Sequence, residues 1–161
     1  MRGLSFLIGD ELYAVDVTLV QKVARMLEIT HVPSAPPEVI GIANLKGKVV
    51  TVLSLSTLIG SANSNDTLHC ANTIVFKYGS SLEDQMGLAV EQPGDLIDID
   101  ISAIRSPPVF AGKAESNCIS GVAEVGDKLY RIVDTESILR RYIPDSDIGS
   151  GISSFGGTEN E

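Results

Sequence analysis

Short apolar runs separated by glycine, proline and polar residues occupy most of the chain. In the N-terminal half they predict strands at residues 4–8 and 12–16 around a turn at 9–11, a strand at 29–32, and a hairpin of 39–45 and 48–55. Val17, Val20 and Val23 have helical spacing, which predicts one or two helical turns there.

The C-terminal half repeats this pattern. It predicts strands near residues 73–78, 86–91, 96–101, 119–125 and 128–133. Residues 135–142 are expected to form a helix with Ile138 and Leu139 inward, because Arg140 and Arg141 suit the negative end of a helix dipole.

An internal match at an offset of 80 residues relates the two halves. Residues 40–59 align without gaps over 120–139, and Gly41 meets Gly121 while Lys48 meets Lys128. Five short strands per copy, at hairpin spacing, predict mainly β structure in which each copy is a small barrel. We expect the first barrel over about 1–60, a linker at 61–72, the second barrel with its helix over 73–143, and a disordered tail at 144–161.

Composition and charge narrow the function. The chain is 43% hydrophobic and 20% charged, as in soluble domains, and its net charge is −9. An acidic protein without tryptophan is a poor nucleic-acid binder, because phosphate neutralisation needs Lys and Arg. No apolar run is long enough to cross a bilayer, and Asp10 and Glu11 break the order of a signal peptide. We expect a cytoplasmic protein with Cys70 and Cys118 reduced.

Candidate chemistry is sparse. The turn Asn44-Leu45-Lys46-Gly47 is not a phosphate-binding loop, because one glycine follows the lysine and a strand comes next. The second copy keeps the bend, as Val125-Gly126-Asp127, but not its charge, which indicates a hairpin.

The sequence also shows no group of residues with the spacing of a metal-binding or catalytic site. His69 and Cys70 sit together in the linker without a second pair, and His31 is expected at the surface. Asp98 and Asp100 alternate with isoleucines, as on the solvated face of a strand. We therefore expect no enzyme activity, no metal and no cofactor, and a binding module as the default.

Several motifs resemble the CheW family of chemotaxis coupling proteins. The resemblance covers nearly all of residues 4–143 and is most specific in the first half. It is carried by F-L-I-G-D-E-L-Y-A-V-D-V (6–17), I-T-x-V-P (29–33), P-x-x-V-I-G-I-A-N-L-K-G-K-V (36–49), L-x-x-L-I-G (55–60), G-L-A-V-E (87–91), I-S-G-V-A (119–123) and L-Y-R-I-V-D (129–134).

The resemblance implies two five-stranded SH3-like barrels around a shared apolar seam. It implies a non-enzymatic cytoplasmic adaptor that joins the tips of chemoreceptors to the regulatory domain of a chemotaxis histidine kinase, in arrays at the membrane but without inserting into it. Two alternatives remain: a scaffold in a related pathway that does not control flagella, such as twitching or development, or a small-ligand-binding barrel or enzyme with polar groups in a pocket.

The resemblance also implies contact residues. The kinase-facing residues would be Ile29, Thr30 and Val32. The receptor-facing residues would be Val17, Val20, Gln21, Lys22, Val23, Gly41, Asn44, Lys46 and Gly47. The three valines alone read more readily as core, but a receptor helix hairpin needs an apolar groove, so at least one of them is expected to be exposed.

This sequence departs from the family at three places. Lys22 stands where the family commonly has an acidic residue, Lys46 where it has arginine, and Ser54-Leu55-Ser56 where it has Asp-Leu-Arg. The usual opposite-charge pair would thus become a like-charge pair of Lys22 and Lys46. We expect these changes to alter the electrostatics of the receptor surface and to leave the fold intact.

Overall fold

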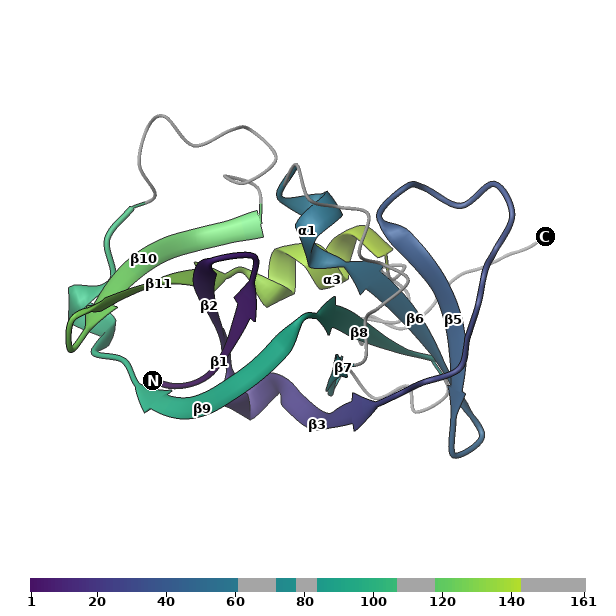
Figure 1. Ribbon diagram of the computed structural model, residues 1–161, viewed down its shortest axis with the longest axis horizontal. Helices are drawn as coiled ribbons and strands as arrows, with labels where there is room; N and C mark the ends of the chain where they lie inside the picture. Colours follow the sequence, from purple (N-terminus) through teal and green to yellow (C-terminus); the bar gives the residue numbers. More distant parts are fainter. Residues whose placement is uncertain (61–71, 78–83, 107–117, 143–161) are drawn as a thin grey trace, which may run out of the picture.

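A computed structural model describes residues 1–60, 72–77, 84–106 and 118–142. The predicted tail at 144–161, and the predicted linker apart from residue 72, lie outside these ranges, as do His69 and Cys70. The described chain is mainly β, with an eight-residue helix at its end (Figure 1).

One sheet, here called sheet A, has five strands in the order β10-β11-β2-β1-β9. All neighbours are antiparallel except β11 and β2, which are parallel. Its strands are β1 (Arg2–Ile8), β2 (Glu11–Asp16), β9 (Gln92–Asp98), β10 (Ile119–Val125) and β11 (Lys128–Val133).

The other sheet, sheet B, has six strands in the order β3-β7-β8-β6-β5-β4. Again one neighbouring pair, β6 with β8, is parallel. Its strands are β3 (Val20–Arg25), β4 (Ile29–Thr30), β5 (Val39–Leu45), β6 (Lys48–Ser54), β7 (Asn72–Phe76) and β8 (Asp84–Val90).

The two halves of the sequence exchange their first hairpins. The β1–β2 hairpin joins β9, β10 and β11 in sheet A, whereas the β7–β8 hairpin joins β3 to β6 in sheet B. The strand orders then correspond, because each sheet runs from β3 or β9 through the borrowed hairpin to β6–β5 or β11–β10. The internal repeat is therefore visible in the topology, although the division between the sheets does not follow the division between the sequence halves (Figure 1).

The expectation of two closed barrels is not met in the described chain. Sheet B ends at β3 and β4, and sheet A ends at β9 and β10. On the free side of β10, a single bridge joins Val122 to Arg105 through two backbone hydrogen bonds of 2.8 Å. β4 holds the same position beside β5 through Ile29 and Thr30. The fold is two separate sheets, and of their four outer strands only β4, with two residues, is short.

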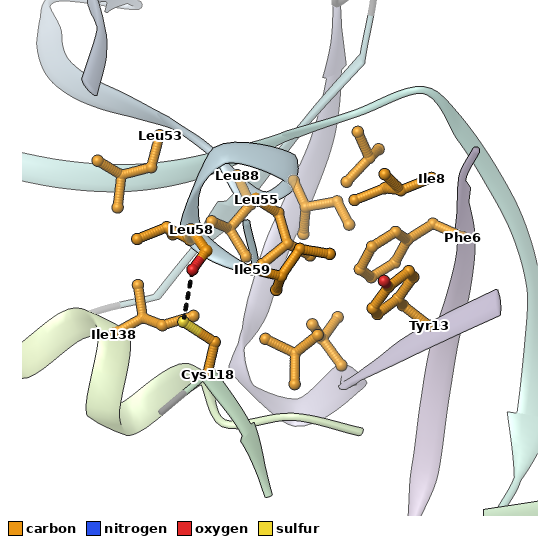
Figure 2. Close-up of a cluster of buried hydrophobic side chains, with 14 of the residues drawn as sticks. Phe6, Ile8, Tyr13, Leu53, Leu55, Leu58, Ile59, Leu88, Cys118 and Ile138 are labelled. Carbon is orange, nitrogen blue, oxygen red and sulfur yellow. Dashed lines mark hydrogen bonds between the residues drawn. The ribbon is translucent and has the colours of Figure 1, made fainter. Parts of the chain in front are cut away.

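The largest apolar cluster lies between the two sheets and draws side chains from both. Phe6 and Tyr13 stack with ring centroids 5.7 Å apart, and α1 (Leu55–Leu58) and α3 (Thr135–Tyr142) complete the cluster (Figure 2). This main cluster is the apolar seam that the family resemblance implies. Each sheet also has a small cluster on its other face, around Ile132 in sheet A and around Val50 and Val52 in sheet B.

Two contacts tie α3 and its surroundings to the first half of the chain. The Cys118 thiol lies 3.7 Å from the carbonyl oxygen of Leu58, and burial raises the pKa of this free thiol (Figure 2). The Tyr142 hydroxyl donates to Glu38, and burial together with this bond raises the pKa of Tyr142. These two contacts therefore link the C-terminal elements to the segments of the first half that contain Leu58 and Glu38.

The predicted helix at Val17–Val23 is wrong beyond its first turn. A 3-10 turn, η1, covers Val17–Leu19, and the Asp16 carboxylate caps it by accepting from the N–H of Thr18. β3 then starts at Val20, with a bulge between Val20 and Lys22. A bulge adds one residue to a strand, so side chains three positions apart face the same side. Val20 and Val23 therefore both face the main cluster and imitate helical spacing.

Other boundaries shift less. The predicted strand at 29–32 ends at Thr30, and His31 lies beyond it, exposed as expected. The predicted strand at 96–101 begins earlier and ends at Asp98, because Asp100 caps a 3-10 turn, η3 (Ile101–Ala103). Its hydrogen bonds from Ser102 lower the pKa of Asp100. Ile101 is consequently exposed, whereas Ile99 is buried as the alternation predicts.

Candidate functional site: the basic end of sheet B

One end of sheet B collects several predicted contact residues. At this end β3 and β8 begin, β7 ends, and the β5–β6 hairpin turns. The residues there include four lysines, which define a surface that we call the basic end: Lys22, Lys46, Lys48 and Lys77. Gln21, Asn44 and Gly47 lie among them, so segments far apart in sequence meet at one place.

The register puts these side chains on the side of sheet B that holds its small cluster. Lys22 pairs with Val75, which pairs with Gly87, which pairs with Val52 of that cluster. Residues paired across strands share a face, and residues two apart on one strand also share a face. Lys48 precedes Val50 by two positions and therefore faces the same side.

The β5–β6 turn confirms the predicted hairpin. Lys46 and Gly47 have φ of 53° and 84°, and positive φ at both central residues is the mark of a type I′ turn. The Asn44 side-chain oxygen accepts from the N–H of Gly47 at 2.9 Å, which fixes the bend. Lys46 is exposed at the tip of this hairpin. Asn44 and Gly47 thus have a structural role in presenting Lys46.

A pair of glutamines bridges β3 and β8 at the basic end. The Nε2 atom of Gln85 donates to the Oε1 atom of Gln21 at 2.5 Å. Gln21 is exposed, whereas Gln85 is only 7% exposed, and its Oε1 atom has no hydrogen-bond partner among the described residues. Leaving a buried amide oxygen unpaired is unfavourable by about 1–3 kcal/mol. Gln85 therefore has an unused acceptor.

The three candidate valines line the edge of the core. Val17, Val20 and Val23 are half-buried and pack against the main cluster, so the expectation of an exposed member among them is not met. Exposed apolar side chains of sheet B lie instead on the β5–β6 hairpin, at Ile42 and Val49, which are 37% and 42% exposed. Both are on the face opposite the small cluster, because their strand neighbours Ala43 and Val50 belong to that cluster.

The predicted kinase-facing residues lie on β4, one of the two edge strands of sheet B, or just after it. Thr30 is exposed, Ile29 is half-buried against the small cluster, and Val32 is half-buried after β4 ends. Gly41 is buried beside β4. A Cβ atom on it would lie 2.2 Å from the carbonyl oxygen of Thr30. Its direct contact with a receptor stays a prediction, and its visible role is to let β4 approach β5.

The corresponding end of sheet A carries the opposite charge. Asp10 and Glu11 lie where β2 begins, and Glu124 and Asp127 flank the β10–β11 turn. Lys128 is the equivalent of Lys48 by the internal repeat. We call the four carboxylates the acidic end. Lys128 and Arg131, which pairs with Glu11, also lie at this end, and Asp84 begins β8 at the basic end. The two equivalent ends therefore differ in the proportion of acidic and basic residues.

A cleft of about 370 Å³ lies elsewhere, between η1 and the start of α3. Its carboxylates have structural partners: Asp16 caps η1, Asp134 accepts from the N–H of Ser137 at 3.2 Å, and Glu136 pairs with Arg140 at 3.5 Å. No histidine or cysteine lines it. This arrangement does not favour the enzyme alternative, which needs uncommitted titratable groups in a pocket.

Two absences hold for the part of the chain that the structure describes. It contains no group of three or more His, Cys, Asp or Glu side chains that could hold a metal ion. None of its helices combines the length and apolar character needed to cross a membrane.

Sequence reasoning missed three residues of the basic end, namely Lys48, Lys77 and Gln85. The repeat offered a signal only for Lys48, through its match with Lys128. Lys77 and Gln85 reach this surface because the β7–β8 hairpin is exchanged between halves. The N–H of Lys77 bonds the carbonyl oxygen of Leu19 at 2.8 Å, which continues the β3–β7 register to the end of the sheet.

Comparison with known proteins gives a consistent result. The CheW-like domain family matches residues 2–142. A chemotaxis protein CheW of Klebsiella aerogenes is 25% identical over 139 residues, covering 84% of this chain and 80% of the relative. One of Helicobacter pylori is 26% identical over 144 residues, covering 88% and 82%.

A solved structure supports the same assignment. The scaffolding protein TtCheW from Thermoanaerobacter tengcongensis superposes with a TM-score of 0.71 at 27% identity, over 83% of this chain and 88% of that one. Because the family match spans nearly the whole chain and the folds agree, this protein belongs to the CheW-like domain family of chemotaxis scaffold proteins.

Proposed function

We propose that this protein is a non-enzymatic adaptor that couples the cytoplasmic tips of chemoreceptors to the regulatory domain of a chemotaxis histidine kinase. It acts in the cytoplasm, where receptors recruit it to arrays at the membrane. The observation that carries the proposal is the gathering of predicted contact residues on sheet B. Residues of β3 and of the β5–β6 turn meet at the basic end, and Thr30 lies on the neighbouring edge.

The division of sheet B into two surfaces suits an adaptor. The receptor would bind at the basic end, through Gln21, Lys22 and Lys46. The kinase would bind along β4, where the exposed Thr30 and the half-buried Ile29 and Val32 form an edge of only two paired residues. A short edge strand leaves backbone groups for a partner while limiting uncontrolled pairing. The two partners could then bind at the same time.

A pull-down tests this proposal. The immobilised protein is exposed to the kinase regulatory domain and to a receptor cytoplasmic fragment, each alone and then together. We expect each partner to be retained alone and both to be retained in the mixture. Retention of neither partner would overturn the proposal. Competition between the two would overturn the assignment of separate surfaces.

A further inference from the structure

We propose that Glu38 is a positioning residue for the kinase-facing edge of sheet B, held in place by the hydrogen bond that it accepts from Tyr142 of α3. The inference rests on the proposed function and assigns a role to two residues outside both contact surfaces. It makes kinase binding depend on a helix of the C-terminal half that need not touch the kinase. We call these two side chains and the bond between them the α3 latch.

The segment between β4 and β5, residues 31–38, carries Val32 and is stiff. Three of its residues are proline, whose ring fixes φ. One turn is closed by a bond from the N–H of Ala35 to the carbonyl oxygen of Val32 at 3.3 Å. The next is closed by a bond from the N–H of Val39 to the carbonyl oxygen of Pro36 at 2.9 Å. A stiff segment transmits a displacement from one end to the other, so the position of Val32 depends on how the far end is held.

Glu38 is that far end, and it is held from two sides. Its carbonyl oxygen accepts from the N–H of Ser54 at 2.8 Å, which fixes its backbone to the end of β6 in sheet B. Its carboxylate accepts from the Tyr142 hydroxyl in the last turn of α3. The Tyr142 ring and Val39 both pack against the main cluster. Glu38 therefore joins the segment to sheet B through its backbone and to α3 through its side chain.

α3 is a firm anchor for the latch, because its apolar side is fixed in the core. Ile138 and Leu139 are buried in the main cluster. Figure 1 shows α3 running from the end of β11 in sheet A toward sheet B. Burial and the bond to Glu38 raise the pKa of Tyr142, so its hydroxyl keeps the proton that it donates. A helix that follows sheet A thus holds a segment of sheet B.

The latch acts on the free protein, before the kinase binds. A segment that moves freely must be ordered on binding, and the free energy of ordering is subtracted from the affinity. With the latch closed, Val32 is presented in one arrangement beside Ile29 and Thr30. Opening the latch should therefore weaken kinase binding without changing any residue that meets the kinase. Receptor binding should be unaffected, because the basic end lies where β6 begins and the latch lies where β6 ends.

The test removes the latch and measures the two partners separately. Tyr142→Phe deletes the donor and keeps the ring, Glu38→Leu deletes the acceptor, and Glu38→Gln keeps an oxygen that can accept the same bond. Affinities of the full-length protein for the kinase regulatory domain and for a receptor cytoplasmic fragment are measured by calorimetry. We expect Tyr142→Phe and Glu38→Leu each to weaken kinase binding by about threefold to tenfold. Glu38→Gln should stay within about twofold, and so should receptor binding in all three variants.

Two controls separate positioning from general stability. The double variant Tyr142→Phe with Glu38→Leu should bind the kinase no more weakly than the weaker single variant, because one bond can be lost only once. Ile138→Val shortens a buried side chain of the same helix, so it should lower the melting temperature but change kinase affinity by less than about twofold. If Ile138→Val weakens kinase binding as much as Tyr142→Phe does, the latch is only structural and the inference is overturned. Circular dichroism confirms that every variant is folded.

Amide hydrogen exchange provides a readout that needs no partner. In Tyr142→Phe the N–H groups of Ala35 and Val39 should exchange at least about threefold faster than in the unmodified protein, because the turns that they close open locally. Ile138→Val should change these two rates by less than about twofold. Unchanged rates in Tyr142→Phe would show that the latch does not hold the segment, which overturns the inference.

The outcomes separate this inference from the proposed function. If the unmodified protein does not bind the kinase domain, the proposed function fails, and the exchange rates alone decide whether the latch holds the segment. If it binds the kinase and the latch variants bind with the same affinity, the inference is overturned and the proposed function stands. An equal loss of receptor and kinase affinity would also overturn it, because the latch would then position the whole molecule rather than one edge.

Discussion

Gly41 lies so close beneath β4 that a Cβ atom on it would sit 2.2 Å from the carbonyl oxygen of Thr30. The repeat reproduces this relationship in sheet A, where a Cβ atom on Gly121 would lie 2.6 Å from the carbonyl oxygen of Arg105. In both sheets a glycine therefore allows a short outer segment to pack on a hairpin strand.

Gly41→Ala should destabilise the protein by about 1–3 kcal/mol, because the added methyl group meets backbone that cannot turn away. Gly121→Ala should act in the same direction. Gly3→Ala is the control, since its nearest neighbour would be the flexible end of Ile99 at 3.1 Å. Urea unfolding measures all three. Equal stabilities would show that β4 and the Arg105 segment can shift without loss.

Val20→Asp should lower stability by about 1–3 kcal/mol, because Val20 faces Phe76 and packs against the main cluster. Leu129→Asp provides the matched control, since Leu129 is 51% exposed on β11 and its replacement should cost less than about 0.5 kcal/mol. Thermal melts by circular dichroism decide the matter. A Val20→Asp protein that melts normally but binds receptor weakly would return this valine to the interface.

Alkaline pH should destabilise the protein through Cys118 and Tyr142. Burial raises the pKa of both groups in the folded state, so the unfolded chain loses these protons first as pH rises. Their contribution to stability is complete below about pH 9 and is lost above it. Tyr142→Phe should cost about 1 kcal/mol at pH 7, through the lost bond to Glu38, and should flatten the decline above pH 10. An unchanged slope in urea titrations between pH 9 and 11 would refute this.

Local structure was largely predictable from the sequence, because it depends on residues that are neighbours in the chain. The hairpins at Gly9 and Gly47 and the amphipathic α3 follow from turn residues and periodicity. The bulge in β3 was not predictable in this way, since it changes the spacing of Val20 and Val23 from that of a strand to that of a helix.

Long-range structure was less accessible. The repeat reveals two copies of a unit but not which copy pairs with which, so the exchange of hairpins could not be read from it. Lys77 and Gln85 entered the candidate site only through that exchange, whereas Lys22 and Lys46 were found through the family resemblance. The sequence predicted which segments form strands, but it did not predict which distant strands pair with one another.

Separated halves of the chain should not fold alone. A fragment of residues 1–60 lacks the β7–β8 hairpin between β3 and β6, and a fragment of 72–161 lacks the β1–β2 hairpin between β9 and β11. We expect each fragment to give little β signal by circular dichroism, and their mixture to recover it. A fragment with a cooperative melt of its own would contradict this.

The exchanged hairpins also bear on how such a chain could arise. A single unit, expressed as an independent protein, would have an open sheet into which only the hairpin of a second copy fits. Two identical units would thus form a domain-swapped dimer, in which every hairpin is donated and every gap is filled. Fusing the units into one chain makes this partnership intramolecular and independent of concentration, and it frees the copies to diverge. The opposite charges of Lys46 and Asp127 at equivalent turns are such a divergence, which an identical pair could not express.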